Sequence, residues 1–498
     1  MNFEILMQVF QLDSIGLCIA GTILGIIFGA VPGLNATIGV SLLLPITFML
    51  SPTAGLLMLG GIYMGGMYGG SITAVLINVP GAIEATCTAW EGYPMTLQGR
   101  SREALYYSIF ASTFGGMVGI LCLIFLTPPL AQVALKFGPP EMLIFALCGL
   151  AVVGVLASKN LWKSLFAMGL GLFLHTIGMD SMTTLYRFTF GIRSMASGLD
   201  IVAIVLGFFC FAEMFRNIGQ KKAENFVYRD IFIKRSTVII RMLKKWTVSV
   251  KASLIGLLIG ILPGIGGGTA IFVAYGEAKR SSKNPELFGK GNVDGIIAAE
   301  SANNAVVGGS LIPLLALGIP GSPTAAIIGA ALTSHGLIIG PSLFLKSADV
   351  AYIFMYGMTF AVIGMMLVGT FGINLFPMIL KINMFYLIPI VMVFALFGAY
   401  SINYNTFDVF VAVIVGAITI LLVRFEIPLS PILIGFVLER LIEENFRRSL
   451  IIATAQKQNI IVYILTRPLS IILGIVLIVF IVYFFGKNKN EKKEIESN

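Results

Sequence analysis

Charged residues are scarce in this chain of 498 residues. Only 11% of them are Asp, Glu, Lys or Arg, whereas a soluble globular domain usually carries about 25%. No Lys or Arg precedes Arg100, so the N-terminus lacks the basic segment that begins a secretory signal peptide. The low charge argues against an ordinary soluble protein, and the 57% of hydrophobic residues predict a membrane protein in contact with a lipid bilayer.

Histidine and cysteine are also rare. His175 and His335 are the two histidines, too few and too isolated to suggest a zinc or haem site. The five cysteines show no paired spacing and favour small core residues over disulfides or metal ligands. The net charge of +9 belongs to membrane-flanking loops rather than to a soluble surface, so no nucleic acid partner is expected. The sequence predicts neither a metal site nor a cofactor.

The signals that resemble an enzyme fail on inspection. The glycines of Gly264–Thr269 resemble a phosphate-binding loop, but no Lys follows at the required place and no strand precedes them. No Ser, His and Asp set for nucleophilic catalysis is evident. We therefore expect a protein that is not an enzyme.

Long apolar runs recur along the whole chain. Many approach the roughly 20 residues that a helix needs to cross a bilayer, and they predict eleven or twelve crossings in an all-α polytopic membrane protein. The clearest runs are Ile15–Val31, Ala104–Leu126, Met142–Ala157, Ile201–Phe215, Phe407–Val423 and Ile460–Phe485.

Basic residues indicate the orientation, because cytoplasmic loops are enriched in Lys and Arg. Residues 216–246 form such a basic loop, between a first membrane repeat at 1–215 and a second at 247–486. A charged cytoplasmic tail follows at 487–498, and the N-terminus is expected outside. A further basic cluster, Arg447, Arg448 and Lys457, lies where this count puts an outside loop. Either Leu429–Leu441 does not span, or that loop is an exception.

Two glycine-rich boxes occur twice, in the same order. Gly25–Gly33 has the same Gly and Pro-Gly skeleton as Gly256–Gly264. Gly69–Gly81 likewise matches Gly308–Gly321, with Pro-Gly at the end of each. The first copy begins outside and the second begins at the cytoplasmic loop, so the copies are expected to be inverted repeats, as in many transporters.

Each Pro-Gly pair is expected to end one helix and to begin another within the membrane. Lys251–Ala278 should therefore form a helical hairpin with its tip at Pro263–Gly268. Broken helices are tolerated only inside protein or beside a watery cavity. The new helix begins with free N–H groups that attract an anion, and the carbonyls before the break can hold a cation.

Polar residues gather around these breaks. Neutral amides and hydroxyls can bind a carboxylate or Na⁺ without a buried charge, although each of them can also serve helix packing. The candidate substrate-binding residues are Gly33, Asn35, Thr37, Ser71, Thr73, Asn78, Gly81, Gly264, Thr269, Ser322 and Thr324. The candidate coupling-ion residues are Asn35, Asn78, Glu300, Asn303 and Asn304.

Three acids need separate interpretations. Glu300 shares a helix face with the two Asn residues that follow it, and an acid at membrane depth is a functional candidate. It can also be a helix-end carboxylate near the polar insertion. Glu84 and Glu91 lie in a less apolar stretch that ends at Arg100, and we expect them at the membrane interface.

These boxes resemble the large permease subunit of the bacterial tripartite tricarboxylate transporter family. The likeness spans nearly the full chain and is strongest in Gly295-Ile-Ile-Ala-Ala-Glu300-Ser-Ala-Asn303-Asn304-Ala, which retains the Glu and both Asn of the family's central motif. It departs at Glu84, where relatives more often carry small or hydroxyl residues, and an acid there can either alter the substrate preference or simply face solvent.

The resemblance implies a secondary transporter in the bacterial inner membrane that imports citrate or a similar carboxylate, driven by a sodium or proton gradient. It also implies two partners, a small membrane subunit of about four helices and a periplasmic solute-binding protein. The residues alone leave a passive anion channel or a membrane scaffold open as alternatives.

Overall fold

The computed structural model describes residues 11–31, 33–156, 160–180, 182–217, 231, 233–264, 266–379, 384–475 and 477–479. The predicted cytoplasmic tail 487–498 lies outside these residues, as do residues 218–230 of the predicted basic loop and Pro32 of the first break.

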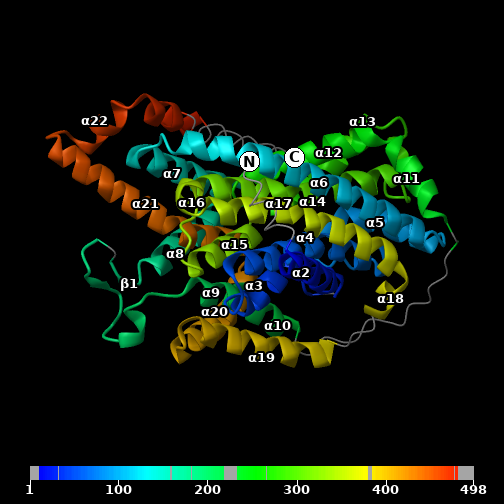
Figure 1. The fold of residues 1–498 in the computed structure, drawn as a ribbon, viewed down its shortest axis with the longest axis horizontal. Helices are drawn as coiled ribbons and strands as arrows, with labels where there is room; N and C mark the ends of the chain where they lie inside the picture. The colour runs from blue at the N-terminus through cyan, green and yellow to red at the C-terminus, as the bar shows by residue number, and fades with distance from the viewer. Residues whose placement is uncertain are drawn as a thin grey trace, which may run out of the picture. The chain divides into compact units, whose positions relative to one another are not determined.

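The described chain divides into two compact units, and the first holds residues 11–131, 201–261 and 266–421. It carries most of the helices (Figure 1). These are α2 (Leu12–Ala30), α3 (Ala36–Thr47), α4 (Pro52–Ile77), α5 (Thr86–Leu97), α6 (Ser101–Ala134, to Ala131), α9 (Ile201–Val205), α10 (Ala212–Asn217), α11 (Arg235–Leu243), α12 (Trp246–Ile261), α13 (Gly266–Ser281), α14 (Val293–Leu317), α15 (Pro323–Ser334), α16 (Pro341–Lys346), α17 (Ala348–Phe371), α18 (Phe376–Ile379), α19 (Met384–Asn403) and α20 (Thr406–Arg424, to Leu421). Short 3₁₀ turns lie at η1 (Ile83–Ala85), η4 (Pro285–Leu287) and η5 (Gly372–Asn374), and a π-helical turn at η3 (Leu206–Phe211).

The second unit consists of described residues in 132–200, 262–264 and 422–479. It contains α7 (Pro139–Leu156), α8 (Leu161–His175), β1 (Gly178–Met179), β2 (Tyr186–Arg187), η2 (Arg193–Met195), α21 (Leu429–Ala455) and α22 (Ile460–Leu465). The antiparallel pair β1–β2 is the one sheet in the described part of the chain. The predicted all-α class is therefore confirmed.

Four of the described helices are long and apolar enough to cross a membrane. They are Leu12–Ala30, Ser101–Ala134, Ala348–Asn374 and Thr406–Arg424. Seven further apolar helices have 10–17 residues, and three of these, α3, α12 and α15, begin or end at a predicted Pro-Gly break. The helices agree with a polytopic membrane protein, and the number of eleven or twelve crossings stays a prediction.

All four predicted breaks occur. The chain leaves helical geometry between α2 and α3, between α4 and η1, between α12 and α13, and between α14 and α15. The hairpin predicted over Lys251–Ala278 is formed by α12 and α13, which pack against each other. Since α13 begins at Gly266, the last glycines of the predicted tip lie in its first turn.

The interior of the first unit is built on α4 and α14. Every residue from Ala54 to Leu76 is buried, and so is every residue from Gly295 to Leu317. Helix α2 packs along α4, and α12 packs along α14, as the most extensive helix pairs in the described chain. The second glycine-rich box of each copy therefore begins on one of these two buried helices, and the first box lies at the end of the helix that packs along it.

The backbone of each copy makes a close contact at the glycine that ends its second box. A Cβ atom at Gly81 would collide with the carbonyl oxygen of Gly29, and a Cβ atom at Gly321 would collide with that of Gly260. Any side chain at these two positions would push the backbones apart. Both glycines are thus required by backbone approach, at matching places in the two predicted copies.

In the second unit, α21 packs against α7 and α8. Two residues of the basic cluster that did not fit the predicted topology, Arg447 and Arg448, lie within this helix and not in a loop, and the third, Lys457, follows its end. The described candidates for membrane spans do not include α21. The same holds for the buried helices α4 and α14, so both alternatives for Leu429–Leu441 stay predictions.

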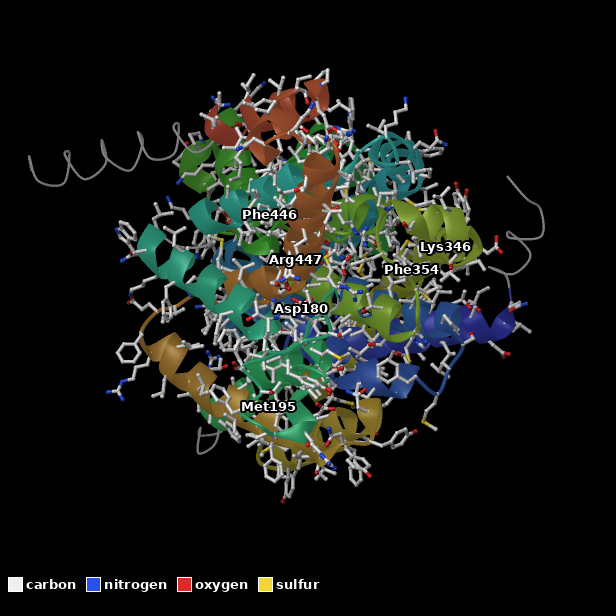
Figure 2. All side chains as sticks on the ribbon, turned by 90° about the vertical axis from the view of Figure 1, so that its left-hand side faces the viewer. Asp180, Met195, Lys346, Phe354, Phe446 and Arg447 are labelled. Atoms are coloured by element: carbon white, nitrogen blue, oxygen red, sulfur yellow. The ribbon has the colours of Figure 1, made fainter. Side chains whose placement is uncertain are left out.

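Charged residues hold the β1–β2 hairpin against α21. Arg447 Nη1 lies 2.7 Å from Asp180 Oδ2 (Figure 2), and Arg187 Nη1 donates to Glu443 Oε1 at 2.7 Å. The backbone N–H groups of Thr183 and Met182 donate to the Asp180 carboxylate, and together with Arg447 they hold its pKa well below the usual range. A lowered pKa means that the ionised form of Asp180 is stabilised, so its contacts with the backbone and with Arg447 persist at neutral pH and weaken only in strong acid.

Candidate functional site

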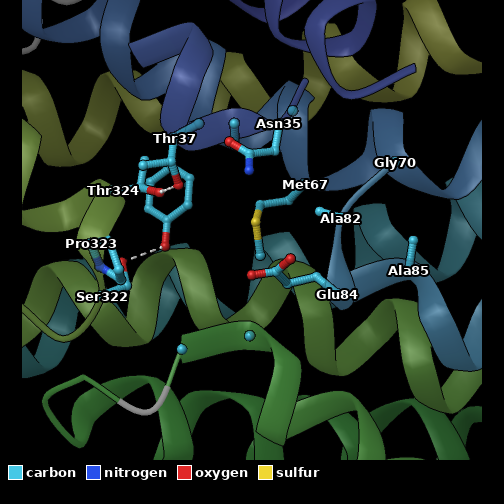
Figure 3. Close-up of a pocket in the computed structure, with 15 residues that line it drawn as sticks. Asn35, Thr37, Met67, Gly70, Ala82, Glu84, Ala85, Ser322, Pro323 and Thr324 are labelled. Atoms are coloured by element: carbon cyan, nitrogen blue, oxygen red, sulfur yellow. Dashed lines mark hydrogen bonds between the residues drawn. The ribbon is translucent and has the colours of Figure 1, made fainter. Parts of the chain in front are cut away.

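A cavity of about 60 Å³ lies within the first unit, where α3, α4, η1, α13 and α15 meet (Figure 3). The volume is enough for a small ion or a few waters. Residues from both predicted copies form its wall: Asn35, Ala36, Thr37, Tyr63, Gly66, Met67, Gly70, Ala82, Glu84, Ala85, Gly266, Gly267, Ser322, Pro323 and Thr324.

Two helices begin at this cavity with matched caps. Asn35 Oδ1 accepts from the N–H of Ile38 at 2.9 Å and caps α3. Ser322 Oγ accepts from the N–H of Ala325 at 3.1 Å and caps α15. The remaining first-turn N–H groups of each helix have no acceptor within the helix. The positive ends of two helix dipoles therefore converge on one cavity.

Two separate sets of bonded hydroxyl groups join the two copies across the cavity. Thr37 Oγ1 and Thr324 Oγ1 are 2.7 Å apart. The Tyr63 hydroxyl lies 2.9 Å from Ser322 Oγ and 3.0 Å from Ser310 Oγ. Each hydroxyl can donate or accept a hydrogen bond, so these hydroxyl groups can reorient toward a carboxylate or toward a cation.

An acid completes the wall. Glu84 lies in η1, just after the Pro-Gly break that ends α4, and its side chain points toward Met67 in Figure 3. A Cβ atom at Gly267 would lie 2.8 Å from Glu84 Cγ, so glycine at that position lets α13 approach η1. The cavity wall contains no Lys, Arg or His.

Two amides of α14 lie behind this wall. Asn303 Nδ2 donates to the carbonyl of Met67 at 3.0 Å, and Asn304 Nδ2 donates to that of Met64 at 3.2 Å. Both Oδ1 atoms are buried and find no hydrogen-bond donor among the described residues. Asn303 Oδ1 is 3.3 Å from the position of a Cβ atom at Gly267. A buried acceptor without a donor is suited to a cation.

Glu300 is fully buried on the same helix, and hydroxyls surround it. Thr88 Oγ1 donates to Oε1, and Ser112 Oγ donates to Oε2 at 2.7 Å. These donors come from α5 and α6. Glu300 is therefore a hydrogen-bonded acid inside the first unit and not a helix-end carboxylate near the polar insertion.

The cavity brings together only part of the predicted set. Asn35, Thr37, Ser322 and Thr324 line it. The predicted residues outside its wall are Gly33, Ser71, Thr73, Asn78, Gly81, Gly264 and Thr269. The Ser71 hydroxyl bonds Ser108 Oγ at 2.7 Å, whereas Asn78 and Thr269 are exposed.

Glu91 is buried against the polar insertion that precedes α14. The side chain is fully buried, and the Tyr275 hydroxyl donates to Oε1 at 2.7 Å. The backbone N–H groups of Gly289, Gly291 and Asn292 also donate to the carboxylate. Glu91 therefore holds the polar insertion before α14, and its depth at the membrane interface stays a prediction.

Sequence reasoning missed Tyr63, Met67 and Glu84 as members of the site. A helical spacing of three and four residues connects Tyr63, Gly66, Met67 and Gly70 along one face of α4, and this spacing is the signal that could have found them. For Glu84, the signal was its place immediately after a Pro-Gly break. Among the described residues, no group of three His, Cys, Asp or Glu side chains is placed to hold a metal ion.

The buried broken helices and the polar cavity between their ends define an all-α polytopic membrane protein with the features of a transporter. The comparison with known families agrees. Residues 15–434 match the Tripartite tricarboxylate transporter TctA family, and the chain belongs to this family. It is therefore a tricarboxylate-transporter membrane subunit.

Two relatives come from Agrobacterium vitis. One is an uncharacterized 52.8 kDa protein in the TAR-I ttuC' 3'region, 38% identical over 446 residues that cover 88% of this chain and 87% of the relative. The other is an uncharacterized protein in the TAR-II ttuC' 3'region, 38% identical over 198 residues that cover 40% of this chain and 82% of the relative. No solved structure matches the chain.

Proposed function

We propose that this chain is the permease subunit of a binding-protein-dependent secondary transporter that imports citrate or a related carboxylate. A sodium or proton gradient drives uptake across the bacterial inner membrane. A periplasmic solute-binding protein delivers the substrate, and a small membrane subunit of about four helices completes the system. Membership of a tripartite family supports these partners.

The observation that carries the proposal is the polar cavity between two capped helix ends. Carboxylate oxygens accept hydrogen bonds, and the free N–H groups of α3 and α15 together with the hydroxyls of Thr37 and Thr324 can donate them. The N-termini after Gly33, Gly81, Gly264 and Gly321 were the substrate contacts inferred from sequence. Residues at the start of all four following segments, α3, η1, α13 and α15, line the cavity wall, and α3 and α15 are the two that begin with a side-chain cap.

The coupling cation binds behind the substrate. Asn303 and Asn304 offer buried amide oxygens that no described donor occupies, and Glu300 lies one turn earlier on α14. The two copies form an inverted repeat, and rocking of one against the other exposes the cavity alternately to each side.

Uptake of labelled citrate and of a dicarboxylate panel tests the proposal. The full chain is expressed with its genomic neighbours, and a sodium gradient is imposed or omitted at fixed pH. Wild-type cells should accumulate at least one carboxylate above equilibrium. Thr324→Val should lower this uptake by about tenfold, because removal of one hydrogen bond to a charged group costs about 1.5 kcal/mol or more.

Thr333→Val is the matched control. It makes the same change on α15, but the Thr333 hydroxyl only donates back to its own helix. The control should take up substrate at the wild-type rate. Uptake that reaches equilibrium without accumulation would indicate a passive channel, and equal loss in both variants would place the substrate elsewhere.

A further inference from the structure

Among the described acids inside the first unit, Glu84 differs from Glu91, Glu300 and Glu103 because no other residue is hydrogen-bonded or ion-paired to its side chain. The carboxylates of Glu91 and Glu300 each accept at least two hydrogen bonds. Glu103 is paired with Arg100 and Arg241. For Glu84, no ion pair and no side-chain hydrogen bond to another described residue occurs, although it is only partly exposed.

The position of Glu84 makes this isolation significant. Its side chain faces a cavity whose wall offers five neutral oxygen-bearing side chains and no basic residue. An ionised carboxylate without a partner is costly in such a place. It would also repel the carboxylate substrate of the proposed function, because like charges at close range are unfavourable. A positive charge at Glu84 removes both costs.

The other groups at the cavity are suited to complete a cation site. The wall presents hydroxyl oxygens of Thr37, Tyr63 and Thr324 and the amide oxygen of Asn35, and oxygen donors are the ligands of hard cations. The volume of about 60 Å³ is far below the roughly 300 Å³ at which ligand pockets begin. In this state the cavity admits an ion with a few waters, and a substrate with two or three carboxylates needs a wider state.

We propose that Glu84 binds a monovalent cation, a proton or Na⁺, and that the anionic substrate enters this cavity only when the cation is present. This inference rests on the proposed carboxylate transport and adds the residue that makes substrate binding conditional on charge. It places a cation next to the substrate, separate from the ion behind the wall at Asn303 and Asn304.

Chemical labelling of the wild-type protein tests cation binding directly. The full-length chain in membranes is treated with dicyclohexylcarbodiimide, which modifies protonated carboxyl groups in apolar surroundings, and modification of Glu84 is measured by mass spectrometry. If Na⁺ is the ligand, added NaCl should lower the modification severalfold at fixed pH, and KCl should not. If the proton is the ligand, modification should rise severalfold as pH falls, without an effect of sodium. Modification that responds to neither, or that is absent throughout, would overturn the inference.

Transport by Glu84→Gln tests the consequence. Gln has the same shape but no charge, so exchange of labelled for unlabelled carboxylate should no longer require the cation in the buffer, and gradient-driven accumulation should fall at least tenfold. Glu277→Gln is the matched control, because Glu277 pairs with Arg280 away from the cavity. It should keep both the wild-type accumulation and its cation dependence.

The outcomes separate this inference from the proposed function. Absence of exchange by the wild-type protein with every carboxylate of the panel would refute the proposed function. Wild-type exchange together with unchanged cation dependence in Glu84→Gln would refute the role of Glu84 alone. If Glu84→Gln fails to reach the membrane, Glu84→Asp and the labelling of the wild-type protein decide the question.

Discussion

At the scale of single residues, the surroundings of a carboxylate decide its role. Glu91 accepts from three backbone N–H groups and a tyrosine, which makes it a structural acid. Glu300 is held by two hydroxyls. Glu84 faces a cavity without a partner among the described residues. The number of donors around each carboxylate therefore separates structural acids from an acid available to a ligand.

Asn303 supports a prediction at this scale. Its Nδ2 group is fixed by the carbonyl of Met67, so its Oδ1 atom keeps one direction and remains free for an ion. Asn303→Ala should abolish ion-coupled uptake, measured as a decrease of at least tenfold, while the protein still inserts in the membrane. Uptake with and without a sodium gradient is the measurement, with membrane fractionation as the check on insertion.

Ser301→Ala provides the control on the same helix. The Ser301 hydroxyl donates to the carbonyl of Ala111 on α6, away from the pair of amides, so its loss should leave the ion dependence intact. Unchanged uptake and unchanged ion dependence in Asn303→Ala would remove this residue from the ion site.

At the scale of elements, the decisive feature is the short helix that begins inside the protein. Helices α3 and α15 have 12 residues each, too few to cross a bilayer, and each begins with a side-chain cap at the cavity. Helix α13 begins with glycines because η1 lies against it. The cavity thus exists because four elements end or begin at one place.

The contact between α5 and the insertion before α14 gives a prediction for stability. In Glu91→Gln, one oxygen is replaced by an amide group that faces N–H donors. The free energy of unfolding should fall by about 1–3 kcal/mol for each buried donor left unsatisfied. Unfolding of the purified protein in detergent is the measurement. Tyr275→Phe removes only one donor and should cost less, and equal stability of Glu91→Gln and wild type would contradict this role.

At the scale of the whole molecule, the direction of insertion follows from charge. Basic residues gather in 216–246 and in the insertion Lys279–Lys290, and none precedes Arg100. The positive-inside rule therefore predicts that the insertion lies in the cytoplasm and the N-terminus outside. An inverted repeat requires this arrangement, because its two copies must begin on opposite sides of the membrane.

Cysteine labelling tests this orientation. In a variant without native cysteines, Gln11→Cys should react with a membrane-impermeant maleimide added to intact spheroplasts. Lys283→Cys should react only in inside-out vesicles. Both positions are exposed in the structure, so a difference between them reports the side of the membrane. Labelling of both from the same side would contradict the predicted inversion.

The sequence was informative about the breaks because their causes are local. Proline lacks an N–H group and glycine tolerates close backbone approach, so Pro263-Gly264 and Pro320-Gly321 end helices whatever surrounds them. The cavity was less predictable. The cavity residues Asn35, Thr37, Ser322 and Thr324 were found because they follow a break. Ser71 and Thr73 carry the same hydroxyl group, but they bond to Ser108 and to the carbonyl of Gly70 instead.

Composition, charge and the repeated glycine boxes determined by themselves that this is an all-α membrane protein with helices broken at four places. They act through solvation and backbone geometry, which depend on each residue and its nearest neighbours. Only the tertiary structure decided that Tyr63 and Glu84 face the cavity, that Glu91 is buried and bonded to the insertion before α14, and that Asn78 lies at an exposed helix end. Those roles depend on which distant segments pack together, and a pattern along one chain does not contain the distance between them.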